Sequence, residues 1–245
     1  LSSHEAASNP YRLYAASNAG SLIGLLGYPL LVEPVAGASL QSVLWSTGFL
    51  ALAALIAITG TCLQMIQGGN LTTSVRSGSA SWYDRFRWVA LAFVPSSLLL
   101  GVTTHITTDI AAMPLLWAVP LALYLVTFIV AFTPQSLIPR EILLKAEALC
   151  LVILSAMMWF DGSNTAGLAI SLAGFFIVAL ARHSELASIK PQADQLTEFY
   201  LWLSAGGALG GIFNAVLAPE MFSRITEYPL TLVAAGFTRL LLVPA

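Results

Sequence analysis

One stretch of this sequence, residues 103–109, concentrates polar and ionisable side chains inside an apolar region. His105 and Asp109 are four residues apart, so a continuous helix would place them on one face, within pairing distance. An ionisable side chain at membrane depth is costly and is by default a candidate for function. The spacing predicts a carboxylate–imidazole pair that binds a cation or relays a proton, with Thr104 and Thr108 as neutral oxygen ligands.

The same stretch has a second, purely structural interpretation. The third apolar helix would leave the membrane here, and its hydroxyl groups would satisfy backbone carbonyls around Pro95 and the exit turn. Further acids are expected on this side of the membrane: Glu33, Asp161, Glu220 and Glu227. Their summed field could attract cations, and Glu33 could join the cation site from the first helix. Equally, acids are tolerated on a face from which Lys and Arg are excluded, so both interpretations stay open.

Small residues form a second pattern, which indicates close helix packing. Two overlapping GxxxG patterns fall on one apolar segment and comprise Gly206, Gly207, Gly210 and Gly211. Small residues let two helix backbones approach closely, and Asn214 could donate or accept a hydrogen bond across such a contact. The first apolar segment has a matching small face that includes Gly20 and Gly24. We expect these two faces to pack together, with a substrate passage as the alternative.

No other combination of residues in the sequence indicates catalysis or a cofactor. It contains no Ser/His/Asp set, no metal-ligand spacing and no haem-type pair of histidines. Cys62 and Cys150 lie in apolar stretches without CxxC spacing and are expected to be packing residues. His183 falls in a basic segment and is expected in solvent. We therefore expect no metal and no cofactor. The net charge of −2 and the lack of a basic run exclude a nucleic-acid partner.

Composition defines the elements that must position these residues. Hydrophobic residues make up 58% of the 245 residues and charged residues 9%, whereas about 25% are charged in an ordinary soluble domain. A helix needs about 20 apolar residues to cross the hydrocarbon core. Eight segments qualify: residues 11–32, 41–66, 87–105, 114–132, 142–160, 165–181, 196–217 and 228–243. Because backbone groups must be satisfied within lipid, we expect an all-α fold, a polytopic transmembrane bundle of about eight spanning helices.

The connections between these segments predict an orientation. Counted alternately, nine of the ten Lys and Arg residues fall on one side of the membrane and only Arg224 on the other. Lys and Arg collect in cytoplasmic loops, so the N-terminus is expected in the cytoplasm. The longest connector, residues 67–86, is rich in Gly, Ser and Thr and is expected to be a flexible cytoplasmic loop. Residues 1–245 are expected to form one integral membrane domain, cut from a longer parent protein.

Several long motifs are similar to those of a known family. They comprise residues 9–21, 28–29, 33–34, 93–98, 103–105, 108–109, 114–117, 196–200, 206–207, 210–211 and 227–229. Together they extend over nearly the whole chain and resemble the membrane region of bacterial spermidine-synthase-like proteins. Such regions are described as major-facilitator-like segments fused to a polyamine aminopropyltransferase.

The resemblance implies that any catalysis belongs to a different domain. In such fusions a soluble Rossmann-like domain after the membrane part carries a glycine-rich loop and a catalytic Asp, and this chain contains neither. The resemblance thus implies a non-catalytic module of the bacterial inner membrane, surrounded by lipid, that binds or translocates a small cationic solute such as a polyamine. Two alternatives remain open. The chain could be a structural or accessory subunit of a respiratory or photosynthetic membrane complex, or the anchor of a missing enzyme domain.

Overall fold

The computed structural model describes residues 11–67, 80–110, 115–133, 138–157, 165–192, 195–222 and 226–238. Within these ranges the chain forms helices and turns, and no strand, so the predicted all-α class is confirmed. Each of the eight predicted segments overlaps one of the longer helices: α2 (Tyr11–Gly27), α3 (Ala38–Gln67), α4 (Trp82–His105), α5 (Ala118–Ala131), α6 (Arg140–Met157), α7 (Thr165–Ser188), α8 (Leu196–Ile212) and α10 (Glu227–Thr238).

Three of these helices continue into a π-helical turn. They are α2, α4 and α8, and the turns are η1 (Tyr28–Val32), η2 (Ile106–Ile110) and η4 (Phe213–Leu217). A short helix, α9 (Ala218–Met221), follows η4. The turns lengthen each of these helices by five residues.

Five stretches among the described residues are long and apolar enough to cross a membrane: Leu13–Val32, Ala38–Cys62, Trp82–Thr108, Ala166–Ser188 and Leu196–Met221. The other three helices fall short for different reasons. α5 is apolar but only 14 residues long, and the described part of α10 has 12. α6 carries four charged residues in its first half. A multi-pass membrane protein follows from the five long stretches, and the count of about eight spans stays a prediction.

Two helices, α4 and α7, extend well beyond their expected bounds. α4 begins at Trp82, so the last part of the expected connector 67–86 is helical, while residues 68–79 lie outside the described residues. Ser81 caps this helix, since its hydroxyl oxygen accepts a hydrogen bond from the backbone N–H of Asp84 at 3.1 Å. α7 continues to Ser188 through a segment that was expected to be a loop.

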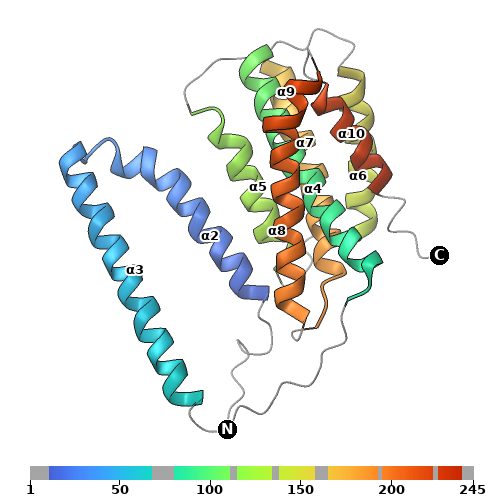
Figure 1. Cartoon of the computed structure of the whole chain (residues 1–245). Helices are drawn as coiled ribbons and strands as arrows, with labels where there is room; N and C mark the ends of the chain where they lie inside the picture. Colours follow the sequence, from blue (N-terminus) through green and yellow to red (C-terminus); the bar gives the residue numbers. More distant parts are fainter. Residues whose placement is uncertain are drawn as a thin grey trace. The chain divides into compact units, whose positions relative to one another are not determined.

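The chain divides into two compact units, one formed by Leu1–Leu22 with Ser79–Ala245 and the other by Ile23–Gly78. In the first unit α4 is the central helix and packs against α8, α7, α10 and α5 (Figure 1). Its inward-facing side chains recur every three or four positions, at Trp88, Leu91, Pro95, Leu98 and Val102. That spacing produces one continuous buried stripe, as expected for a helix in contact with several neighbours.

The second unit consists of the end of α2, η1 and α3, joined by a tight turn. The hydroxyl of Tyr28 donates to Oε1 of Gln41 at 2.9 Å, and Nε2 of Gln41 donates to the carbonyl of Ala36 at 2.7 Å. These bonds tie the turn to the start of α3. None of the residues in the most apolar window of α3 is buried within the structure. Within the second unit, the end of α2 and η1 therefore bury none of this window.

The close helix contact in the first unit joins α8 to α4. A Cβ atom placed on Gly206 would lie 2.5 Å from the carbonyl oxygen of Val89, and one on Gly210 would lie 2.7 Å from that of Phe93. Such distances leave no room for a side chain, so the two backbones touch at this face. Ser96 reinforces the contact, because its hydroxyl donates to the carbonyl of Gly207 at 2.8 Å.

This partner differs from the expected one, which was the small face of the first apolar helix. Within the first unit, a Cβ on Gly20, Gly207 or Gly211 would meet nothing within 4 Å. The physical reason is that α4 offers its own small residues where α8 approaches, among them Ala92. One of the two overlapping GxxxG faces thus forms a helix contact and the other is open.

Candidate functional site

Charged residues of the first unit collect at one of its ends. α7 ends there at Ser188, and α8 begins there at Leu196. In the first turn of α8, Glu198 accepts a hydrogen bond from Nε of Arg85 at 2.6 Å. Arg85 also lies over the ring of Trp82, 4.6 Å from the ring centroid. The hydroxyl of Tyr11 donates to the carbonyl of Pro191 at 2.6 Å. These contacts place the first turns of α2, α4 and α8 at the same level as the end of α7, which we call the charged end.

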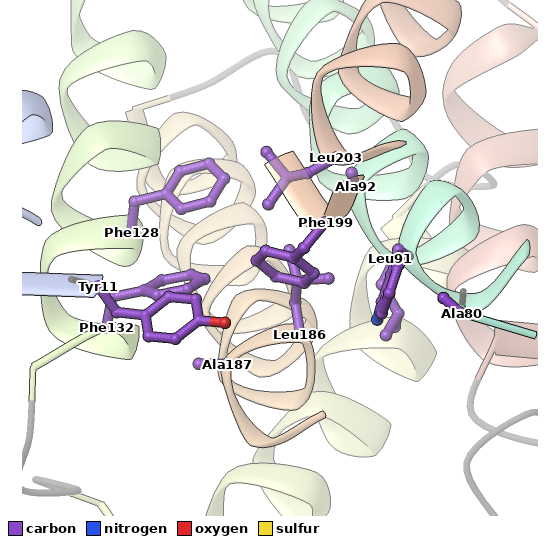
Figure 2. Packing of buried hydrophobic residues seen from close by; sticks show 11 residues of the cluster. Tyr11, Ala80, Leu91, Ala92, Phe128, Phe132, Leu186, Ala187, Phe199 and Leu203 are labelled. Carbon is purple, nitrogen blue, oxygen red and sulfur yellow. The ribbon is translucent and has the colours of Figure 1, made fainter. Parts of the chain in front are cut away.

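Aromatic side chains pack in the core of the bundle next to the charged end. Figure 2 shows Tyr11, Phe128 and Phe199 converging from α2, α5 and α8 onto the same core. The ring centroids of Tyr11 and Phe199 are 6.0 Å apart, in an edge-on arrangement. The polar groups of this end are therefore adjacent to a packed cluster of apolar side chains.

A fully buried ion pair joins α6 to α7. Nη2 of Arg182 donates to Oε2 of Glu147 at 2.5 Å, and both side chains have 0% exposure. Nη1 of the same guanidinium lies 3.2 Å from the hydroxyl oxygen of Thr238, at the end of α10. Taking two charges out of water costs several kcal/mol per ion, so the geometry of the pair must compensate. Ionisable residues enclosed in this way mark functional sites in membrane proteins.

His183, the next residue of α7, is fully buried, although a solvated position was expected. Its ring stacks on Phe128 at a centroid distance of 3.6 Å, and its Nδ1 lies 2.8 Å from the hydroxyl oxygen of Thr127. That hydroxyl donates its single proton to the carbonyl of Tyr124 at 2.7 Å. Thr127 can therefore only accept from His183, which places the proton on Nδ1. Nε2 then presents a lone pair without a hydrogen-bond partner.

A second ion pair between α6 and α7 lies closer to the surface. Nε and Nη2 of Arg140 donate to the two carboxylate oxygens of Glu185, at 2.7 and 3.1 Å. The two partners differ greatly in burial, since Glu185 is 4% exposed and Arg140 is 62% exposed. Hydrogen bonding to the carboxylate raises the pKa of Arg140 above its ordinary value, so the guanidinium stays charged.

Arg140 and Glu185 border a cavity of about 320 Å³ between the end of α5, the start of α6 and the last turns of α7. We call it the charged-end cavity. Its polar lining comprises Thr133, Arg140, Ser184, Glu185, Ser188 and Lys190. Aliphatic side chains such as Leu143 and Leu180 complete the wall. The cavity thus offers one buried carboxylate, two cations and three hydroxyl groups to a ligand.

The residues first singled out by their spacing lie toward the other end of α4. His105 stacks on Tyr228 of α10, with ring centroids 5.3 Å apart. Thr104 and Thr108 are exposed. The backbone of Asp109 lies in η2, and its side chain is outside the described residues. The predicted pairing of His105 with Asp109 is therefore a prediction still.

Two neighbouring threonines behave as the structural interpretation of this stretch requires. The hydroxyl of Thr103 donates to the carbonyl of Leu99 at 2.6 Å, and that of Thr107 donates to the carbonyl of Thr103 at 2.8 Å. Both hydroxyl protons are thus used within the helix. Glu33 is an exposed residue of the turn after η1, in the second unit.

Asn214, in η4, joins three helices through neutral groups. Its Nδ2 donates to the hydroxyl oxygen of Ser97 at 2.5 Å and to the carbonyl of Gly210 at 3.0 Å. Ser97 lies 2.8 Å from the hydroxyl of Thr231, which itself donates to the carbonyl of Glu227 at 2.7 Å. The proton order is therefore fixed as a directed chain from Asn214 through Ser97 to Thr231. The hydrogen bond to Ser97 is the cross-helix contact that the sequence allowed for Asn214.

Sequence reasoning did not single out the groups at the charged end. One signal was present, because Glu147 is a lone acid inside the segment 142–160 that was itself assigned to the membrane. An acid at that depth requires a cationic partner, which should have directed attention to Arg182. Nothing local indicated that Glu185 would be buried or that Arg140 would reach it.

Among the described residues, no group of three or more His, Cys, Asp or Glu is arranged to hold a metal ion. In comparisons with known proteins, no family model, no curated protein and no solved structure matches the chain.

Proposed function

We propose that this chain is a non-catalytic, multi-pass membrane module that binds a small cationic solute in the charged-end cavity. The observation that carries the proposal is Glu185, a carboxylate with 4% exposure that borders a cavity. A carboxylate held away from water gains from a bound cation what it loses in hydration. The cavity volume of about 320 Å³ lies at the lower end of the range for small-molecule sites, roughly 300–1,000 Å³.

The lining of the cavity suits an extended amine. Ser184, Ser188 and Thr133 place hydroxyl oxygens around Glu185, and these can accept hydrogen bonds from ammonium groups. Aliphatic side chains on the same wall can pack against methylene groups of the solute. Polyamine as the solute class comes from the resemblance to the membrane region of spermidine-synthase-like proteins. We place the cavity on the cytoplasmic side of a bacterial inner membrane, because basic residues concentrate at the charged end of the first unit.

A second candidate function is supported by a different observation. α3 buries none of its most apolar window against the rest of the second unit, so this broad apolar surface needs lipid or further membrane helices to cover it. That surface favours a structural role, either as an accessory subunit or as the anchor of an enzyme domain. Such a module needs no solute site, so a binding measurement separates the two functions.

Spermidine binding to the purified chain in lipid nanodiscs tests the proposal. We expect saturable binding to wild type, loss of binding in Glu185→Gln, and wild-type binding in Glu220→Gln, an exposed acid of α9. Asp109→Asn is the matched variant for the site at the far end of α4, and we expect it to bind as wild type does. Loss of binding in Asp109→Asn alone would move the site there. No binding to wild type at millimolar spermidine would leave the structural role.

A further inference from the structure

α6 and α7 are joined by two ion pairs of opposite polarity, and the two pairs differ in how firmly they are held. In the inner pair the cation, Arg182, comes from α7, and both partners are fully buried. In the outer pair the anion, Glu185, comes from α7, and its partner Arg140 is 62% exposed. The inner pair is enclosed by protein on all sides. The outer pair combines a fixed anion with a cation that already reaches solvent.

We propose that Arg140 is a displaceable counter-ion, which occupies Glu185 when no ligand is present and yields its place to a cationic ligand. This inference rests on the proposed function and adds a mechanism to it. Arg140 is the first residue of α6 and follows Pro139. Its side chain starts from the first turn of α6, and its rotation away from α7 breaks the two hydrogen bonds to Glu185.

The burial of Glu185 dictates that the exchange is coupled. If Arg140 left alone, a carboxylate that is 4% exposed with Arg140 in place would lose its ion-pair partner, and a poorly hydrated, unpaired charge is unfavourable. Arg140 itself loses little contact on leaving, because most of its side chain is already exposed. Departure of Arg140 and arrival of an external cation are thus favourable together and unfavourable separately.

The other charges that face the cavity point to the same exchange. Lys190 also lines the cavity, and its Nζ lies 4.8 Å from the ring centroid of Tyr11. With Arg140 in place, the cavity carries two cations and one anion and repels a third cation. A cationic ligand therefore gains only if Arg140 withdraws. An anion such as a phosphate group would behave in the opposite way, since it would need both Arg140 and Lys190.

Removing Arg140 thus has opposite consequences for the two classes of ligand. We would measure the affinity of spermidine, and separately that of inorganic phosphate, for wild type and Arg140→Gln in nanodiscs. Spermidine should bind Arg140→Gln about tenfold more tightly, because the competing charged hydrogen bonds are gone. Arg140→Lys keeps a competing cation with a single point of contact, and its affinity should fall between the two. Arg140→Gln combined with Glu185→Gln should not bind spermidine.

Arg85→Gln is the matched control, because it opens an ion pair of similar geometry that does not border the cavity. Its spermidine affinity should equal that of wild type. An unchanged or weaker affinity in both Arg140 variants, with wild type still binding, would overturn the exchange and leave the proposed function intact. Phosphate binding to wild type that is lost in Arg140→Gln would overturn it in favour of an anion site. No spermidine binding to wild type would overturn the proposed function itself.

Discussion

The first unit holds its helices together in two ways, and the difference between them is instructive. At the charged end, α6, α7, α4 and α8 are joined by full charges: Arg182 with Glu147, Arg140 with Glu185, and Arg85 with Glu198. Along α4 the contacts with α8 and α10 are made by glycine backbones, hydroxyl groups and one amide. Full charges join helices toward the charged end of the unit, and neutral groups join them farther along α4.

This division follows from the cost of desolvation. A charged pair in a low-dielectric interior must be complete to be tolerated, and it leaves a large penalty when one partner is lost. A neutral hydrogen bond between membrane helices contributes about 0.6 kcal/mol on average and at most about 1.7. The charged end is therefore the more sensitive region to single substitutions, and the neutral contact of α4 is the more tolerant one.

The largest expected effect comes from breaking the buried pair. Glu147→Leu leaves the guanidinium of Arg182 enclosed without its anion and should lower the free energy of unfolding by about 3–5 kcal/mol. Glu147→Leu combined with Arg182→Met removes both charges and should recover most of that loss. Equilibrium unfolding in mixed detergent micelles measures both values. A double variant no more stable than Glu147→Leu alone would contradict the assigned pair.

An intermediate effect is expected at the glycine contact. Gly210→Leu drives a side chain into the carbonyl of Phe93 and should cost about 1–3 kcal/mol through overpacking. Gly211→Leu is one residue away on the open face and should be neutral or slightly stabilising, since Leu favours a helix by up to about 1 kcal/mol over Gly. Thermal unfolding in the same detergent compares the two variants. Equal losses of stability in both would remove the distinction between the two faces.

The smallest effect is expected in the neutral network. Asn214→Ala deletes the donor that reaches Ser97 and Gly210 and should cost about 1 kcal/mol. Ser97→Ala interrupts the same chain one step later, and the double variant should cost less than the sum of the two single changes. A double-mutant cycle by detergent unfolding provides the coupling. Additive losses would show that Asn214 and Ser97 act independently.

Much of the architecture was predictable, and the reason is that it is local. A run of apolar residues must become a helix in lipid because its backbone groups have no other partners. The segment around Trp88 and Leu91 therefore had to be helical whatever packed against it. Even the N-terminal cap at Ser81 followed a local rule, although it was missed by assigning residues up to 86 to a loop. Helix α7 was cut short for a related reason, because Arg182 and His183 look like loop residues when their partners are unknown.

What the sequence by itself determined is the helical class, the approximate position of each helix and the presence of membrane-length segments. Only the tertiary structure decided which helix the face formed by Gly206 and Gly210 touches, since several segments offer small residues and sequence spacing does not rank them. Only the tertiary structure decided, too, that Glu147 meets Arg182 and that Glu185 is buried beside a cavity. Those outcomes depend on the approach of α6 to α7, and the strength of a charge–charge contact depends on the dielectric around it, which no single segment specifies.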